Sequence, residues 1–308
     1  MRIPTLAPEY EVMCAAIAEA PAIPTLEPEA ARAMWSAFLV GEREQIGEIR
    51  ELQYPGVERD LAARLYRPEG KPVAVVLFIH GGGWVLGDIE THDIAMTGLV
   101  ERSGCAVLSI NYRLAPETPF PGGLEDCFAA LRWLEDNREA LGLGGIPLIV
   151  SGDSAGGNLA AALCILTRNR AGPAIDGQLL LYPVTDARRS LPSYTERKSG
   201  GLLTASDMEW FWNHYVSGSA ALSDLASPLL CETLAGLPPA IVVTAEFDPL
   251  RDEGKGYAER LKLAEVPCRV IHFDDLPHGF VTSYQISPAS NAALTSIANA
   301  LRELATVG

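Results

Sequence analysis

From about residue 46 onward, the chain alternates short apolar runs with longer amphipathic stretches. The apolar runs, several of them continuous in Val, Ile and Leu, predict strands that are covered on both faces. These predicted strands span residues 48–55, 62–68, 73–80, 105–112, 147–153, 177–183, 240–248 and 268–275. Stretches with helical periodicity occupy residues 126–141, 155–170, 251–265 and 290–305. The alternation predicts an α/β fold with an eight-stranded, mostly parallel sheet flanked by helices.

Two segments interrupt this alternation, residues 1–45 and 187–237, because neither contains a strand-like run. Both could be helices that pack on the faces of the sheet. The second segment, however, lies between two predicted strands at the carboxyl edge of the sheet, where ligands bind in open α/β folds. We therefore expect the two segments to form a helical cap over that edge, with residues 46–186 and 238–308 as the α/β domain.

Composition narrows the class of protein. Apolar residues make up 48% of the 308 positions and charged residues 20%, as in globular proteins. The formal net charge of −15 disfavours partners that are nucleic acids or anionic membranes, so we expect neither partner. The first residues lack the apolar core of a signal peptide, and no window is apolar enough for a membrane span, which predicts a cytoplasmic protein.

Cysteine usage points to a reducing compartment. The six cysteines are scattered along the chain without a Cys-x-x-Cys pair, and most lie in apolar surroundings. We expect buried free thiols rather than disulfides or metal ligands, and we expect neither a metal nor a cofactor.

The stretch Gly152-Asp153-Ser154-Ala155-Gly156 lies between a predicted strand and a predicted helix. Glycine, aspartate and serine are ordinary turn and helix-capping residues, so a purely structural turn is one interpretation. The other is a nucleophile elbow, in which a strained strand-to-helix turn exposes the Ser154 hydroxyl above the sheet. The second interpretation requires a base, an acid and hydrogen-bond donors elsewhere in the chain.

His278 is the best candidate for the base. In a fold with a nucleophile elbow, the chain order is serine, acid, histidine, so the base must come late in the sequence. His278 follows the last predicted strand in a loop marked by Pro277 and Gly279, whereas His272 lies within that strand and favours a structural role. The acid should follow the preceding strand, which favours Asp248; the alternative, Asp252, lies where we expect the N-cap of the next helix.

Donors for a negatively charged reaction intermediate are available after the strand at 73–80. Three glycines follow it directly, at residues 81–83, and glycines let backbone N–H groups approach a ligand closely. A phosphate-binding loop is disfavoured, because the run has neither Gly-Lys-Ser/Thr nor the Gly-x-Gly-x-x-Gly spacing before a helix. Together with the N–H of Ala155, these amides would form an oxyanion hole.

Six blocks of the sequence carry a family resemblance: HGGGW, NYRLAPE, GDSAGGNLAA, YPVTD, DPLRDEG and HGF, between His80 and Phe280. In this order and spacing, they resemble the bacterial hormone-sensitive-lipase-like esterases of the α/β-hydrolase fold. The resemblance implies a catalytic triad of Ser154, Asp248 and His278. It also implies oxyanion donors at Gly82, Gly83 and Ala155, a helical cap, and a scaffold role for His80.

These expectations describe a serine carboxylic-ester hydrolase acting on small-molecule esters of short to medium acyl chain. Trp84, Trp210, Tyr215 and Phe280 are candidates for the walls of the substrate pocket, although the two cap aromatics would equally suit a cap core. The same machinery could serve an amidase, lactonase or peptidase. A ligand-binding receptor of the same fold needs a defective triad, and His278 is present. The resemblance further suggests a homodimer paired through an edge strand such as 268–275.

Overall fold

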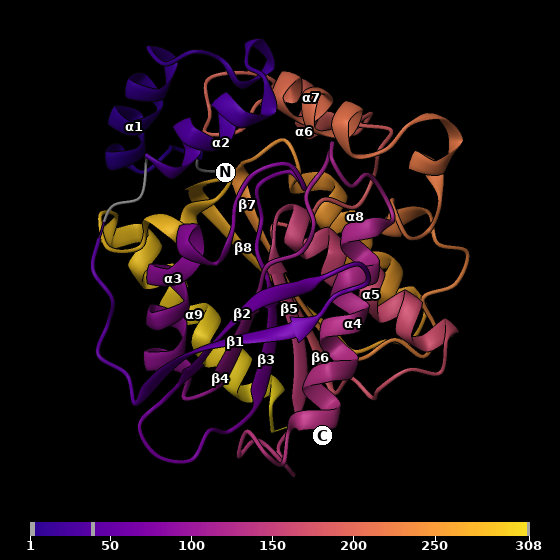
Figure 1. Cartoon of the computed structure of the whole chain (residues 1–308). Helices are drawn as coiled ribbons and strands as arrows, with labels where there is room; N and C mark the ends of the chain where they lie inside the picture. The colour runs from indigo at the N-terminus through magenta and orange to yellow at the C-terminus, as the bar shows by residue number, and fades with distance from the viewer. Residues whose placement is uncertain (1–3, 38–40, 307–308) are drawn as a thin grey trace.

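A computed structural model describes residues 4–37 and 41–306; residues 1–3, 38–40 and 307–308, which belong to the predicted segments 1–45 and 238–308, lie outside it. Eight strands form one sheet in the order β1-β2-β4-β3-β5-β6-β7-β8 (Figure 1). The strands are β1 (Glu48–Pro55), β2 (Asp60–Arg67), β3 (Val75–Ile79), β4 (Ala106–Ile110), β5 (Leu148–Asp153), β6 (Gly177–Leu181), β7 (Ala240–Phe247) and β8 (Cys268–Pro277). β2 runs antiparallel to both β1 and β4, and all other neighbours are parallel, which confirms the predicted eight-stranded, mostly parallel sheet.

The central strands are buried on both faces, as their continuous apolar sequences predict. Every residue of β3, β4, β5 and β6 is buried. Alternate side chains of β3 enter two different apolar clusters: Leu77 belongs to one cluster and Phe78 to the other, on opposite faces of the sheet. The sheet is therefore the middle layer of three.

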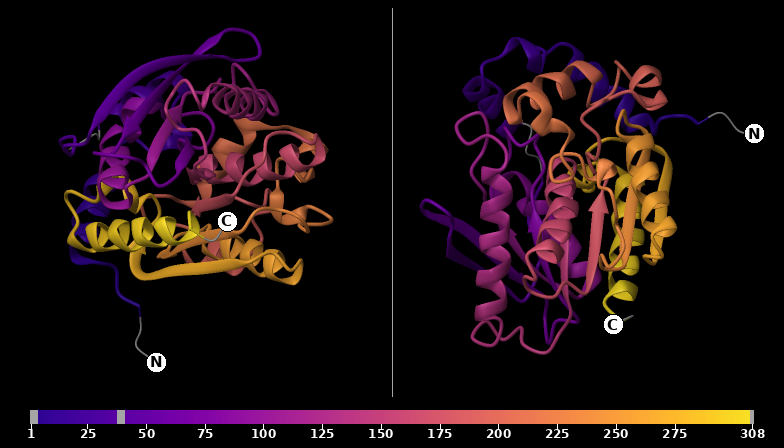
Figure 2. Two further views of the ribbon diagram at one scale, coloured as in Figure 1. Left: turned by 90° about the horizontal axis from the view of Figure 1, so that it is seen from below. Right: turned by 90° about the vertical axis from the view of Figure 1, so that its right-hand side faces the viewer.

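Helices cover both faces of the sheet (Figures 1 and 2). On one face lie α4 (Gly122–Asn137), α5 (Ala155–Asn169) and α8 (Arg251–Leu263). On the other lie α3 (Ile89–Ser103) and α9 (Pro288–Leu304), which pack against each other. The sequence did not reveal α3, because its buried residues include Thr91, His92 and Asp93, so hydrophobicity alone shows no clear helical period.

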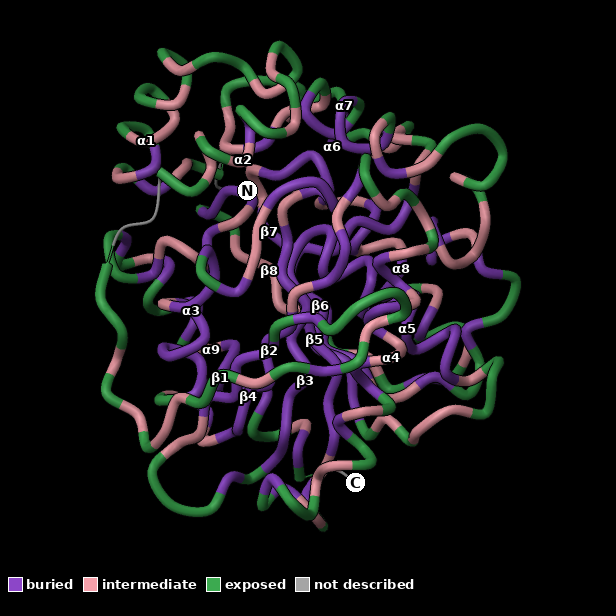
Figure 3. Tube along the Cα trace, viewed as in Figure 1, coloured by how far each residue is buried: buried purple, intermediate pink, exposed green. Residues whose placement is uncertain are grey.

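The two strand-free segments lie together beyond the carboxyl ends of the strands (Figures 1 and 2). The first contains α1 (Pro8–Ala18) and α2 (Pro28–Ser36), and the second contains α6 (Pro192–Glu196) and α7 (Ala205–Tyr215). α7 packs on the 3-10 turn Ile23–Thr25, which joins α1 to α2, so the segments contact each other. Figure 3 shows that exposed and intermediate positions dominate α1 and α2, whereas the central strands of the sheet are buried.

Within the described ranges, no helix is both long and apolar enough to cross a lipid bilayer.

Candidate active site

Ser154 occupies a sharp turn between β5 and α5, as the single residue between strand and helix. Its backbone angles, φ 56° and ψ −119°, cost a non-glycine residue on the order of 1–3 kcal/mol. Neighbouring backbone holds the turn: the Ser154 N–H donates to the Leu181 carbonyl at 2.8 Å. A Cβ at Gly156 would overlap the Ile79 carbonyl oxygen, so only glycine lets α5 start this close to β3.

A continuous chain of hydrogen bonds connects Ser154 to His278 and Asp248. The Ser154 Oγ lies 2.9 Å from His278 Nε2, and His278 Nδ1 lies 2.8 Å from Asp248 Oδ2. Because the carboxylate can only accept, Nδ1 carries the proton and Nε2 accepts from the serine hydroxyl. Ser154 is 7% exposed, His278 is 8% exposed and Asp248 is fully buried, so little water reaches these bonds.

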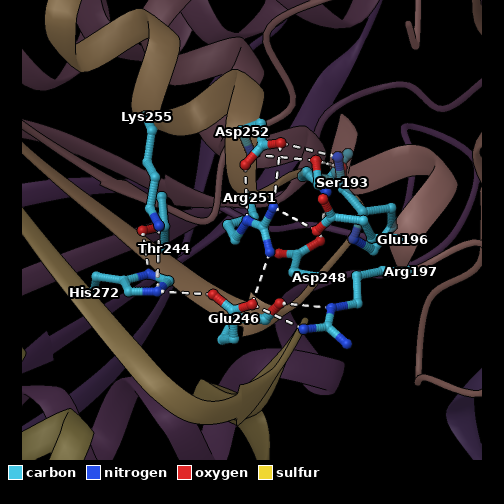
Figure 4. Close-up of polar contacts among 12 residues, drawn as sticks. Ser193, Glu196, Arg197, Thr244, Glu246, Asp248, Arg251, Asp252, Lys255 and His272 are labelled. Carbon is cyan, nitrogen blue, oxygen red and sulfur yellow. Dashed lines mark hydrogen bonds and ion pairs between the residues drawn. The ribbon is translucent and has the colours of Figure 1, made fainter. Parts of the chain in front are cut away.

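A polar network holds the loop that carries Asp248 (Figure 4). Asp248 follows β7 directly and accepts the Leu250 N–H at its second oxygen, Oδ1, at 2.8 Å. Two residues earlier, Glu246 pairs with Arg197 at 2.8 Å and with Arg251 at 2.7 Å. The Ser193 hydroxyl of α6 donates to the Pro249 carbonyl at 2.7 Å. The acid is thereby fixed from both sides of its loop and by the second strand-free segment.

The alternative acid and base lie elsewhere in this network. His272 is part of β8, with Nδ1 2.9 Å from Thr244 Oγ1 and Nε2 3.2 Å from Glu246 Oε2, and its ring makes no bond to Ser154. The expectation that Asp252 caps the next helix is wrong: Leu250 is the N-cap and Asp252 lies within α8, where its carboxylate accepts the Ser193 N–H.

The glycine loop after β3 folds back on itself beside the serine turn. The Gly82 carbonyl accepts the Leu86 N–H at 2.7 Å, which closes the loop. Among the described residues, the backbone N–H groups of Gly82, Gly83 and Ala155 donate to no protein acceptor. Ala155 is the first residue of α5, where N–H groups point away from the helix and favour negative charge. These three unpaired donors suit an oxyanion hole.

Sequence reasoning missed one histidine–carboxylate pair beside the serine turn. The Asp153 carboxylate accepts the Gly81 N–H at 2.8 Å and lies 3.0 Å from His92 Nε2. His92, the partner of Asp153, comes from α3, the helix that the sequence pattern did not reveal. His80 is also buried beside the loop, where it stacks on Tyr112 with 4.4 Å between ring centroids.

Two of the candidate pocket residues stack against each other where α7 meets the glycine loop. The Trp84 and Tyr215 rings lie 4.2 Å apart and nearly parallel, at 2°. Phe211, another aromatic residue of the same segment, contacts the loop directly: a Cβ at Gly83 would overlap its ring. Phe211 lies one helical turn before Tyr215, so the spacing of four residues is the signal that places both on one face of α7.

The other two pocket candidates, Trp210 and Phe280, do not stack on the Trp84–Tyr215 pair. Trp210 packs on Phe211 and His214 of its own helix, with ring centroids 5.3 Å and 4.1 Å away. Phe280 is fully buried and packs on Tyr182, whose ring in turn lies 4.9 Å from that of His278. Phe280 therefore belongs to the apolar cluster that includes the buried face of α9, and its ring contacts Tyr182, which in turn lies beside His278.

Arg32 joins α2 to the loops beside the site. Its Nε donates to the Val85 carbonyl at 2.8 Å, just after the glycine run. Its two terminal nitrogens donate to the Glu117 carboxylate at 2.8 and 2.7 Å, and one of them also to the Ala115 carbonyl at 2.9 Å. One side chain of the first strand-free segment thus contacts two loops of the α/β domain.

Comparison of the sequence with known proteins identifies a family that agrees with this site geometry. Residues 76–282 match the sequence pattern of a protein family described as the alpha/beta hydrolase fold. Carboxylic ester hydrolase LipN of Mycobacterium tuberculosis is 40% identical over 264 residues, which cover 83% of this chain and 70% of LipN. Ethyl acetate hydrolase of Pseudomonas putida is 36% identical over 279 residues, which cover 87% of this chain and 86% of that protein.

Comparison with solved structures supports the same family. A thermostable esterase from Pseudomonas putida superposes with a TM-score of 0.93 at 32% identity, and the match covers 100% of both chains. An ester hydrolase from the metagenome of Lake Arreo, solved with a derivative of bipyridine phosphonate, gives a TM-score of 0.92 at 34% identity and covers 97% of this chain and 99% of that one. The chain therefore belongs to the hormone-sensitive-lipase-like family of the alpha/beta hydrolase fold, and it is a serine hydrolase of the carboxylesterase and lipase class.

Proposed function

We propose that this esterase hydrolyses small carboxylic esters of short to medium acyl chain through a triad of Ser154, His278 and Asp248. The observation that carries the proposal is the buried hydrogen-bond chain from Ser154 Oγ to His278 Nε2 at 2.9 Å and from His278 Nδ1 to Asp248 at 2.8 Å. A serine becomes a useful nucleophile only when a neighbouring base takes its proton, and this chain supplies that base in the required tautomer.

In the first half of the reaction, the Ser154 oxygen attacks the ester carbonyl while His278 Nε2 takes the hydroxyl proton. The resulting oxyanion is held by the free N–H groups of Gly82, Gly83 and Ala155. The tetrahedral intermediate collapses, the bond to the alcohol breaks, and the alcohol leaves with the proton from His278. Asp248 stabilises the imidazolium throughout and keeps its own charge.

In the second half, a water molecule attacks the acyl-enzyme. His278 removes a proton from the water, and the same three amides hold the second oxyanion. The carboxylic acid product forms when the bond to the Ser154 oxygen breaks and His278 returns the proton to that oxygen.

The helices of residues 1–45 and 187–237 act in this proposal as a cap that limits the acyl chain. Phe211 lies against Gly83, and Tyr215 stacks on Trp84, so aromatic rings occupy the space above the glycine loop. Ser154 is only 7% exposed beneath them. A relative that covers most of this chain is named for ethyl acetate, an ester with a two-carbon acyl group, which supports a small acyl pocket.

A panel of 4-nitrophenyl esters from two to sixteen acyl carbons tests both statements. We expect turnover to peak at short to medium chains and to be lost in Ser154→Ala, and we expect a fluorophosphonate probe to label the wild-type serine but not that variant. A peak at palmitate would contradict the acyl-chain limit, and turnover by Ser154→Ala would contradict the nucleophile. Anilides and lactones belong in the same panel, because faster turnover of either would reassign the substrate class.

A further inference from the structure

A second histidine–carboxylate pair lies beside the serine turn. His92 of α3 points its Nε2 at Asp153 Oδ1, 3.0 Å away, and the two side chains are only 3% and 7% exposed. Asp153 directly precedes Ser154, so the pair is adjacent to the nucleophile without touching it. The reaction described above does not use this pair.

The hydrogen bonds of His92 indicate an imidazolium. Its Nε2 faces a carboxylate, which can only accept. Its Nδ1 faces Thr91 Oγ1 at 3.0 Å. Because the Thr91 hydroxyl donates its only proton to the Asp88 carbonyl at 2.7 Å, the Thr91 oxygen can only accept from the His92 ring. A neutral ring would leave one nitrogen lone pair against an acceptor, whereas the cation satisfies both.

The charges around His92 agree with this assignment. Burial alone would lower its pKa, but the Asp153 carboxylate outweighs burial and holds the pKa above its usual value. The other titratable groups that face it are Asp88, which favours the cation, and His80, whose own pKa burial lowers to about 4, so that His80 is neutral. His92 and Asp153 are therefore a buried ion pair.

The same pair controls the glycine loop. Asp153 Oδ1 accepts from both His92 and the Gly81 N–H, the latter at 2.8 Å. A Cβ at Gly81 would lie 2.6 Å from Asp153 Oδ2, so the loop backbone and the carboxylate touch with no room for a side chain. Gly82 and Gly83, the next two residues, supply free N–H groups to the oxyanion site.

We propose that His92 is a positioning residue for oxyanion stabilisation: with Asp153 it forms a second, non-reacting pair that fixes Gly81 and balances the carboxylate charge beside the nucleophile. Fixing Gly81 sets the direction of the amides at 82 and 83. Balancing Asp153 prevents a bare carboxylate from repelling the oxyanion and from stabilising the protonated His278. This inference rests on the proposed esterase function.

Three variants separate the charge of His92 from its shape. His92→Gln keeps an N–H toward Asp153 but no charge, His92→Phe removes both, and His92→Gln with Asp153→Asn restores a neutral pair. For 4-nitrophenyl acetate we expect kcat to fall roughly 10-fold in His92→Gln and roughly 100-fold in His92→Phe, because loss of one oxyanion donor costs about 10²–10³ in kcat. KM should stay within about 3-fold of the wild-type value in both variants. Glu90→Gln, on the exposed side of α3, is the control and should retain wild-type kcat.

The pH profile of kcat/KM provides the readout that a merely structural role would not move. The groups that face His278 are Asp248, Ser154 and the Tyr182 ring, and Asp153 acts on it through charge. In His92→Gln the negative charge of Asp153 has no positive partner, so the acid limb of the profile, where kcat/KM rises with pH, should move to higher pH. In the double variant with Asp153→Asn the acid limb should return toward its wild-type position.

Two results would overturn the inference. One is an unchanged kcat and acid limb in His92→Gln while wild type hydrolyses the ester; the other is an acid limb that stays shifted in the double variant. Thermal unfolding of each variant shows whether it is folded. If wild type itself turned over no ester, the proposed function would fail instead, so the two failures are distinguishable.

Discussion

The serine turn and the helices that we propose to form a cap, in residues 4–37 and 187–237, lie next to each other but are packed to different degrees. Around Ser154, fully buried strands, backbone hydrogen bonds and glycines in close approach leave no freedom of position. Among the helices of the proposed cap, α1 buries one residue, Tyr10, and α2 buries one, Ala31, whereas α7 buries six of its eleven. The proposed cap contacts the α/β domain through side chains such as Arg32 and through backbone bonds such as the one from the Phe120 N–H to the Tyr215 carbonyl at 2.8 Å. Packing around the proposed nucleophile is thus close throughout, whereas α1 and α2 are held by few buried residues.

Removing the charge of Asp248, the proposed triad acid, should give the largest effect. In Asp248→Asn we expect kcat to fall about 10⁴-fold, because the amide can no longer hold His278 in the required tautomer. Steady-state kinetics with 4-nitrophenyl butyrate measures the loss. Asp274→Asn, which changes a largely exposed carboxylate at the end of β8, serves as the matched control and should stay within about 2-fold. Equal losses in both variants would rule out a special role for Asp248.

Gly83→Ala tests the contact between the rigid loop and the cap. The new methyl would overlap Phe211, and the residue has a φ of +60°, which is strained for alanine. We expect kcat to fall about 100-fold, comparable to the loss of one oxyanion donor. Adding Phe211→Leu should recover part of the loss if the ring, rather than the backbone angle, displaces the loop. No recovery at all would show that the cap contact is unimportant.

Arg32→Ala tests the attachment of the cap alone. The change removes the hydrogen bonds to Val85, Ala115 and Glu117, and partly exposed ion pairs of this kind contribute on the order of 1 kcal/mol. We expect KM to rise roughly 3- to 10-fold while kcat changes less, because the triad does not depend on α2. Arg32→Lys, which keeps the charge but not the forked geometry, should lie between. A fall in kcat with an unchanged KM would place Arg32 in the catalytic machinery instead.

Tyr215→Phe should have the smallest effect. The Tyr215 hydroxyl is buried and, within residues 4–37 and 41–306, has no hydrogen-bond partner, while its ring stacks on Trp84. Removing an unpaired buried hydroxyl and keeping the ring should leave stability unchanged or raise it by up to about 1 kcal/mol. Urea unfolding measures the change. A loss of more than 1 kcal/mol would show that the hydroxyl has a partner in solution, such as a bound water.

The parts of the site that sequence could predict are those encoded locally. All eight strands were predicted, the central ones most directly because each is a continuous apolar run. Ser154, Asp248 and His278 each directly follow a strand. His92 could not be found, because it lies on a helix whose buried face carries polar residues that pair only in three dimensions. Arg32 escaped for the same reason, because its partner Val85 is distant in the chain. The contact of Phe211 with Gly83 could not be predicted either, because these two residues are also distant in the chain.

The contact between Gly83 and Phe211 also sets a rule for redesign of the substrate pocket. A library that varies position 83 alone meets an aromatic ring at every substitution. A library that varies position 211 alone can enlarge the pocket, but the loop beneath it keeps the shape that a glycine allows. Positions 83 and 211 should therefore be varied together, because a smaller residue at 211 makes room for a side chain at 83.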